Sequence, residues 1–229
     1  MNIVAGVNAG SKDEADETSG LVHLLEHYVL FRGTDLRSGS EIARDLRRHG
    51  AVFNAHTGQD LALFEVSLPS EHFAFGLDVQ KEILFRLKIG EAELAAEKEV
   101  ILEEIRQIED DAFRLGQSLV YRNLLAGHPY GRPIHGDPEK IRQMAAADVD
   151  GDGKDELVPG TYALDDNGIP MWRAGLGHND AGYIADILPD RPGYEIFFGV
   201  ESRSPKNGVC LADARTGELI WGYEGSTVH

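Results

Sequence analysis

The segment His23-Leu24-Leu25-Glu26-His27 places two histidines and a glutamate within five positions. On a helix, residues three and four apart share one face, so we expect His23, Glu26 and His27 to project into one small volume. Neutral imidazoles suit Zn²⁺, and a catalytic zinc keeps three protein ligands and one water. Glu26 would lie close enough to that water to act as its general base. The alternative is a solvated helix face on which these residues meet by chance.

The third ligand has to come from a distant part of the chain. Residues 91–111 are a strongly predicted helix, on which Glu97 and Glu104 lie seven positions apart and share one face after two turns. This helix therefore offers carboxylates to the site. For Glu97 the alternative is solvated charge, because the same helix carries several other glutamates, namely Glu91, Glu93, Glu99, Glu103 and Glu109.

The order of these residues resembles the M16, or insulinase-type, inverzincin metallopeptidases, in which a glutamate follows the H-x-x-E-H segment by roughly 76 residues. Seventy-six residues separate His27 from Glu104. The resemblance implies that His23, His27 and Glu104 bind zinc, that Glu26 is the general base and that Glu97 is a supporting acid. It extends to four other stretches, residues 10–14, 31–34, 54–57 and 128–133.

The same resemblance implies a peptide substrate and a partner. In such enzymes an exposed strand edge captures the peptide by strand addition, which makes Asn54 and Ala55 candidate substrate contacts. The family also pairs the zinc-bearing half with a second, similar domain, so activity is expected to need such a domain or subunit. The other histidines, His56, His72, His128 and His135, have no partners of comparable spacing, and we expect surface or structural roles for them.

A second group of possible ligands lies in an acidic, glycine-rich loop. Oxygen ligands stand at alternate positions there, which is typical of Ca²⁺ sites. The loop is not an EF-hand, because no glutamate occupies its twelfth position and a strand-like segment follows it. The alternative is an acidic turn without a ligand. The candidate ligands are Asp148, Asp150, Asp152, the carbonyl of Lys154, and Glu156.

From this loop onward the chain resembles the calcium-dependent rhamnogalacturonan lyases, which have a β-propeller fold. The resemblance rests on residues 148–156, 177–180, 190–195 and 213–218. It implies one or two propeller-like blades, because a complete propeller needs several. Two roles are open for His178, Asp180, Asp186 and Glu195, namely ion-linked or turn-forming; we expect turn roles and assign them no catalytic one.

Near Ala147 the sequence changes from long helical patterns with short strand-like runs to brief strand-like runs separated by Gly, Asp and Pro. This change predicts an α+β domain over residues 1–147 and a partial all-β segment over residues 148–229. The first is expected to be an M16-like α/β sandwich with an antiparallel sheet. Its predicted strands are 2–7, 51–56 and 62–68. Its predicted helices are 19–31 with Ser19 as N-cap, 41–48, 70–87, 91–111 and 113–126. Later strands are predicted at 156–158, 195–200 and 218–223.

Composition narrows the choice of partners. The chain has 229 residues, 42% of them hydrophobic, and a formal net charge of -17, which argues against nucleic acid and anionic membranes as partners. The single cysteine, Cys210, is expected to be a small buried hydrophobe. No signal segment or long apolar run is evident, so the chain as it stands is expected to be soluble and cytoplasmic.

Three hypotheses remain at this stage. The first is a zinc metalloendopeptidase, whose activity depends on the missing final elements and partner half. The second is a calcium-binding, polysaccharide-lyase-like β module. The third is an inactive junction of two gene fragments, because both resemblances meet within residues 144–149.

Overall fold

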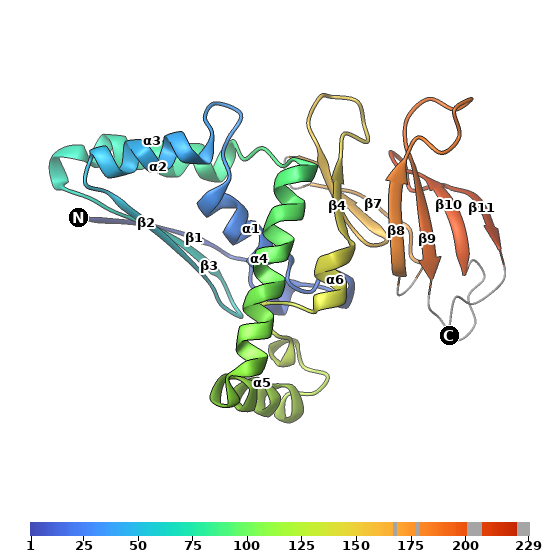
Figure 1. Ribbon diagram of the computed structural model, residues 1–229, viewed down its shortest axis with the longest axis horizontal. Helices are drawn as coiled ribbons and strands as arrows, with labels where there is room; N and C mark the ends of the chain where they lie inside the picture. Colours follow the sequence, from blue (N-terminus) through green and yellow to red (C-terminus); the bar gives the residue numbers. More distant parts are fainter. Residues whose placement is uncertain (167–168, 177–178, 201–207, 224–229) are drawn as a thin grey trace. The chain divides into compact units, whose positions relative to one another are not determined.

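The computed structural model describes residues 1–166, 169–176, 179–200 and 208–223 (Figure 1). The chain forms two compact units. The first comprises Met1–Ala15, Ser19–Lys88 and Ala96–Asp137, and the second comprises Asp16–Thr18, Ile89–Ala95 and Pro138–His229. Each is described by itself below.

The first unit contains a three-stranded antiparallel sheet in the order β1-β3-β2, formed by β1 (Asn2–Val7), β2 (Val52–Thr57) and β3 (Ala62–Ser67). Alternate residues of the central strand β3, such as Phe64 and Val66, are buried, as expected for a sheet with one covered face. Because β3 is central, β2 is an edge strand. The edge predicted at Asn54 and Ala55 is therefore present in the fold.

Helices of the first unit pack on this sheet. The core joins Ile42 and Leu46 of α2 (Gly39–Arg48), Val66 of β3, and Val79 and Ile83 of α3 (Phe73–Phe85). The remaining elements are α1 (Leu21–Phe31), α5 (Ala112–Leu124) and the short 3-10 helices Ser11–Asp13, Ser70–His72 and Pro129–Gly131. The long helix α4 spans Glu91–Asp110. An α+β fold is thus confirmed for this part of the chain.

The start of α1 differs from the prediction. The N-cap residue is Gly20, at a φ of 92°, and Ser19 does not cap the helix. The Glu14 carboxylate performs this role, because it accepts hydrogen bonds from the backbone N–H groups of Gly20 (2.9 Å) and Val22 (2.8 Å). These hydrogen bonds satisfy backbone donors at the start of the helix, where N–H groups lack partners within the helix. The expected Ser19 cap was wrong because the cap comes from an earlier loop.

The second unit is all-β after α6 (Pro138–Gln143). One four-stranded antiparallel sheet has the order β4-β5-β6-β7 and the other has the order β11-β10-β9-β8. Their strands are β4 (Met144–Ala147), β5 (Glu156–Pro159), β6 (Tyr162–Leu164), β7 (Pro170–Arg173), β8 (Asn179–Ala185), β9 (Glu195–Val200), β10 (Val209–Asp213) and β11 (Leu219–Tyr223).

Both sheets contribute to one core, which includes Val158, Phe198 and Cys210. Cys210 is free and fully buried, as expected of a small hydrophobe, and burial raises the pKa of its thiol to about 11. Within the described residues, no helix is long and apolar enough to cross a membrane.

Polar side chains organise the loops of this unit. Buried Glu195 accepts hydrogen bonds at 2.9 Å from the N–H groups of Ile187 and Leu188, which fits the turn-forming role expected for it. Asp180 differs, because it lies within strand β8 and not in a turn. His178 lies outside the described residues.

Candidate metal centre

Helix α1 presents His23, Glu26 and His27 on its buried face, where each is 6–7% exposed. The spacing of three and four residues brings their side chains to one side of the helix, as expected. The two imidazole rings lie edge to face, with centroids 4.6 Å apart. The alternative of a solvated helix face does not fit this burial.

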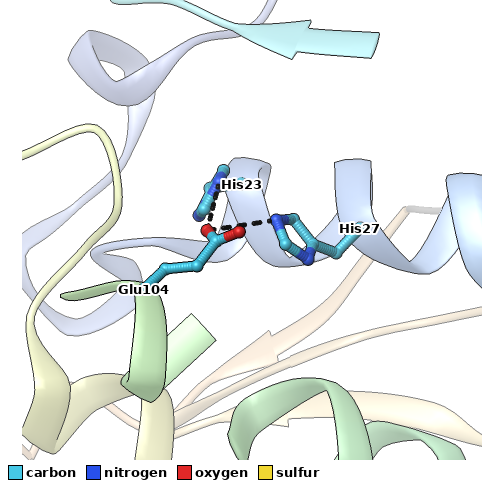
Figure 2. A group of neighbouring side chains, drawn as sticks. All are labelled: His23, His27 and Glu104. Atoms are coloured by element: carbon cyan, nitrogen blue, oxygen red, sulfur yellow. Dashed lines mark ion pairs between the residues drawn. The ribbon is translucent and has the colours of Figure 1, made fainter. Parts of the chain in front are cut away.

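The third side chain comes from α4. Glu104 Oε2 lies 3.7 Å from His23 Nε2 and 3.4 Å from His27 Nε2, so both rings direct the same kind of nitrogen at one carboxylate oxygen (Figure 2). One possible ligand atom from each residue lies within 4.8 Å of the other two. The structure therefore brings together the three residues that the sequence predicted as zinc ligands.

These distances suit a tetrahedral zinc ion. With bonds of about 2.1 Å, neighbouring ligand atoms of a tetrahedron lie about 3.4 Å apart. The separations of 3.4 and 3.7 Å between the imidazole nitrogens and the carboxylate oxygen are close to that value. Two imidazoles and one carboxylate also match the donor set of catalytic zinc sites.

The protonation of His23 also favours a metal. Burial, together with the nearby His135, His27 and His56, lowers the pKa of His23 to about 3, so this ring is neutral at physiological pH. A neutral imidazole has a lone pair for a metal ion. Burial alone would lower the pKa of His27, but the nearby carboxylates of Glu97 and Glu104 outweigh it and raise this pKa.

Glu97 is 2% exposed and lies behind the ligands. Its Oε2 is 3.5 Å from His27 Nδ1, and its Oε1 is 2.7 Å from Arg32 Nε. A carboxylate on the second nitrogen of a metal-binding histidine fixes the orientation of the ring. The structure thus places Glu97 beside the ligand, as expected, and adds Arg32, to which spacing alone gave no role.

The side chain of Glu26 is hydrogen-bonded to a residue of the sheet. Thr57, at the end of β2 and 3% exposed, donates a hydrogen bond from its hydroxyl to Glu26 Oε2. Asn54 and Ala55 belong to the same strand, so the edge predicted to bind peptide leads directly to the base. The sequence offered one signal for Thr57, its place in the stretch 54–57, and the role was missed.

His135, for which a surface or structural role was expected, contacts one of the candidate ligands. Its ring lies edge to face with that of His23, with centroids 4.8 Å apart. Burial, the largest influence, and the charges of His27 and Arg114 lower the pKa of His135, although Glu104 and Glu26 oppose them. The contact depends on a loop more than 100 residues after His23, which spacing could not reveal.

The acidic loop of the second unit forms a separate cluster. Carboxylate oxygens of Asp148, Asp150 and Glu156 lie within 4.8 Å of one another, and a second group joins Glu156 to Asp165 and Asp166. Asp152 belongs to neither group. Instead it accepts a hydrogen bond from the Lys154 N–H at 2.9 Å.

Glu156 is the centre of this cluster. It is fully buried, and its Oε2 accepts hydrogen bonds from the N–H groups of Val149 (2.7 Å) and Asp150 (3.3 Å). Among the described residues, Oε1 has no hydrogen-bond partner. Burial raises the pKa of Glu156 to about 7, and the neighbouring Asp150 and Asp148 add to the effect. A cation would satisfy both the free oxygen and the excess charge.

Comparisons with known proteins match the two parts of the chain to two different families. Residues 2–138 match the sequence model of the insulinase family, peptidase family M16. Residues 136–228 match that of the C-terminal domain of rhamnogalacturonan lyase family 11. Both resemblances expected from the sequence are therefore confirmed.

Individual relatives agree. The chain is 31% identical over 224 residues to an uncharacterized zinc protease, YmxG, of Bacillus subtilis, covering 97% of this chain and 51% of the relative. It is 46% identical over 86 residues to the rhamnogalacturonan endolyase YesW of that species, covering 37% of this chain and 14% of the relative. The solved first half of the periplasmic protease PqqL from Escherichia coli matches with 26% identity and a TM-score of 0.55, over 61% of this chain and 31% of that one. The chain spans about half or less of each.

Proposed function

The chain belongs to the insulinase family of peptidases, family M16, and on this premise we propose that its first unit is a zinc metallopeptidase domain that hydrolyses peptide bonds. The observation that carries the proposal is the convergence of His23, His27 and Glu104 at the spacing of a tetrahedral zinc site. The zinc protease YmxG among the relatives supports the same metal.

The roles of the protein groups follow from their positions. A zinc ion held by these ligands would supply Lewis acidity and make a water acidic enough to react near neutral pH. Glu26 accepts the proton of the attacking water and delivers it to the leaving amine. Thr57 fixes the carboxylate of Glu26, and the Arg32 and Glu97 pair fixes the ring of His27.

The substrate in this proposal is an extended peptide. β2 is the edge strand next to the site, and Asn54 and Ala55 lie three and two residues, respectively, before Thr57. A peptide that adds to this edge would form main-chain hydrogen bonds, which recognise many sequences. We propose that Asn54 and Ala55 contact it.

We further propose that a second M16-like half completes the active site. The PqqL structure is described as the first half of a protease, and it matches this unit. Stabilising the oxyanion of the transition state requires donors aimed at it from across the cleft. A second half, in the same protein or in a partner, would supply these donors.

Metal analysis tests the zinc site. The full chain is expected to bind one zinc ion, and Glu104→Ala should lower its zinc affinity by at least about 100-fold, because one of three ligands is lost. Glu103→Ala is the matched control, since Glu103 is exposed on the same helix and pairs with Arg106 at 2.8 Å. Zinc content that is equal in both variants would contradict the proposal.

Turnover is tested with a quenched fluorescent peptide. Glu26→Gln should retain zinc and lose hydrolysis by at least about 100-fold, because a general base contributes that much. Any hydrolysis by the parent chain should also stop after dialysis against a chelator. Activity that persists without zinc would contradict the proposed mechanism.

A second function is favoured by the cluster around Glu156. We propose that the second unit binds Ca²⁺ through Asp148, Asp150 and Glu156, with Asp152 supporting the loop, and that its two sheets are blades of a β-propeller. Titration calorimetry should show Ca²⁺ binding that Glu156→Gln abolishes. Asp190→Asn, at an exposed loop position, is the control.

A further inference from the structure

A pocket of about 550 Å³ lies in the first unit, next to the metal site. Its volume is in the range of small-molecule and side-chain binding pockets. It is formed by one face of α5, Ile108 of α4 and the segment from Tyr130 to His135. Helix α5 contributes residues spaced as one helical stripe, namely Arg114, Gln117, Ser118, Tyr121 and Arg122.

The charge of this lining is opposite to that of the chain. The protein has 39 acidic and 22 basic residues, yet none of the described residues that line the pocket is Asp or Glu. Three are arginines, Arg114, Arg122 and Arg132. Because acidic residues outnumber basic ones in the chain, a random set of lining residues would more often contain carboxylates. The pocket lined by Arg114, Arg122 and Arg132, called the arginine pocket below, is therefore locally positive in a negatively charged protein.

Two carboxylates near the pocket, Asp111 and Asp60, do not neutralise its charge, whereas Arg132 also acts on Glu14. Asp111 approaches Arg114 Nε only to 3.9 Å, and both side chains are about half exposed or more, so this ion pair is weak. Asp60 accepts hydrogen bonds from Lys12 Nζ (2.7 Å) and Tyr130 Oη (2.6 Å), and its charge is already matched by that lysine.

The pocket adjoins the metal ligands. His135 lines it, and the ring of His135 contacts the ring of His23. Arg114 is close enough to lower the pKa of His135. A group bound in the arginine pocket would therefore lie beside the bond that the metal site cleaves.

We propose that the arginine pocket binds a carboxylate of the peptide substrate next to the scissile bond, an inference that rests on the proposed peptidase function. Guanidinium groups bind carboxylates through two parallel hydrogen bonds, and the polar stripe of α5 adds donors around them. The carboxylate belongs to an Asp or Glu side chain or to the C-terminus of the peptide. The domain then prefers peptides that carry a carboxylate next to the scissile bond.

Peptide binding to the full chain carrying Glu26→Gln tests the pocket without turnover. Three amidated, fluorescein-labelled decapeptides differ only in a central Glu, Gln or Lys, and a fourth is the Gln peptide with a free C-terminal carboxylate. The Glu peptide or the free-acid peptide should bind about 10-fold more tightly than the amidated Gln peptide, a factor equal to about 1.4 kcal/mol. The one that gains identifies the source of the carboxylate.

Arginine variants locate the effect. Arg114→Gln and Arg122→Gln should each remove most of the preference, whereas Arg114→Lys should retain part of it. Arg106→Gln is the control, because Arg106 lies on α4 outside the pocket and pairs with Glu103. Circular dichroism and zinc content of the variants should equal those of the parent, which shows that the fold and the metal site are intact.

The outcomes separate the two proposals. Equal affinity for all four peptides, no binding up to about 1 mM, or tightest binding of the Lys peptide overturns the arginine pocket, even where one zinc is bound. A preference for carboxylate that Arg114→Gln removes, in a chain that binds no zinc, supports the pocket and overturns the peptidase proposal. A preference unchanged in both Arg→Gln variants also overturns the pocket.

Discussion

At the residue scale, one histidine of the candidate metal site, His27, lies against a buried carboxylate. Glu97 lies between Arg32 and His27, with its carboxylate nearly inaccessible to water. Burying a carboxylate alone is costly, and the ion pair with Arg32 offsets part of that cost. On the proposed zinc site, we therefore expect the orientation of His27 to depend on Arg32, which does not contact the candidate ligands' metal-facing atoms.

Removing Arg32 tests this dependence. Arg32→Met should lower the free energy of unfolding of the zinc-free chain by roughly 2–3 kcal/mol, less than for a fully buried pair because Arg32 is partly exposed. It should also weaken zinc binding, since His27 loses its orientation. Urea denaturation and zinc titration measure the two effects. The double variant Arg32→Met/Glu97→Leu should recover most of the stability, and an unchanged single variant would argue against a structural pair.

Glu14 gives a pH dependence whose sign can be worked out. Burial raises its pKa from 4.5 to about 7, although the N–H groups of Gly20 and Val22 oppose the shift. Between these two values the folded chain holds a proton that the unfolded chain has released. The contribution of Glu14 to stability is therefore greatest below pH 4.5 and falls as pH rises to about 7, by roughly 3 kcal/mol.

The variant Glu14→Gln removes this contribution. It should be less stable than the parent at acidic pH, because an amide cannot accept hydrogen bonds from both N–H groups. The difference should shrink as pH rises from 4.5 to 7. Urea denaturation of the zinc-free proteins across this range measures it, with Glu71→Gln, an exposed position, as control. A difference that is constant with pH would exclude Glu14 as the titrating group.

Residue types, spacing and the family resemblance predicted which side chains converge at the candidate site, but not the residues that hydrogen-bond around it. His23, Glu26 and His27 follow from helix geometry, and Glu104 from the family resemblance. Thr57 and Glu14 could not be found this way, because their partners are reached through a strand edge and a loop. Such contacts depend on the tertiary fold and leave no periodic signal.

At the scale of elements, the join between α1 and α2 is tightly packed. A Cβ at Gly39, the first residue of α2, would lie 1.8 Å from the carbonyl oxygen of Arg32 and 2.3 Å from that of Phe31. Both oxygens are backbone atoms at the end of α1, so the clash cannot be relieved by a side chain. The helix that carries the histidines is thus fixed against α2 by a glycine.

Two alanine substitutions should act in opposite directions. Gly39→Ala should destabilise the first unit by roughly 3 kcal/mol through this clash. Gly116→Ala should stabilise it by about 0.5–1 kcal/mol, since Gly116 is inside helix α5 and a Cβ there would meet nothing within 4 Å. Thermal unfolding measures both. Equal effects of the two changes would show that the contact at Gly39 is not rigid.

Element types were largely predictable, and their ends were not. The strands 2–7 and 195–200 match the predicted ranges. The helix predicted from Glu41 begins at Gly39, because Ser38 and Glu41 form a reciprocal capping box that was not used. The helix predicted over 70–87 is a 3-10 turn followed by α3, ending at Phe85. Apolar periodicity locates a helix, whereas local hydrogen bonds end it.

At the scale of the whole molecule, the chain combines two units, each with its own core and its own candidate cation site. The division predicted at Ala147 rests on the change in residue composition and apolar pattern along the sequence. Strand β4, which precedes that point, pairs with β5, which follows it. The two family matches meet at residues 136–138. The change in residue composition and apolar pattern located the change in fold class. It could not show that β4 belongs to the second unit, because β4 pairs with a strand that comes later in the chain.

Two units with separate cores and different ligand sets should respond to different metals. Calorimetry of the full chain should show two unfolding transitions. Zn²⁺ should raise the midpoint temperature of one transition and Ca²⁺ that of the other. At 100 times its dissociation constant, each ion should stabilise its unit by about 2.7 kcal/mol. Glu104→Ala should abolish only the zinc effect and Glu156→Gln only the calcium effect. A single transition that both metals shift would show that the units unfold together.

The calcium response should also depend on pH, because Ca²⁺ requires the ionised carboxylate. Burial and the neighbouring aspartates raise the pKa of Glu156 to about 7, so protons compete with the cation below that pH. Calcium affinity should therefore fall about 10-fold for each pH unit below about 6, where one proton is displaced per ion bound. Titrations between pH 5 and 8 measure this slope. A flat profile would mean that Glu156 is not a ligand, and the buried Oε1 would then need another partner.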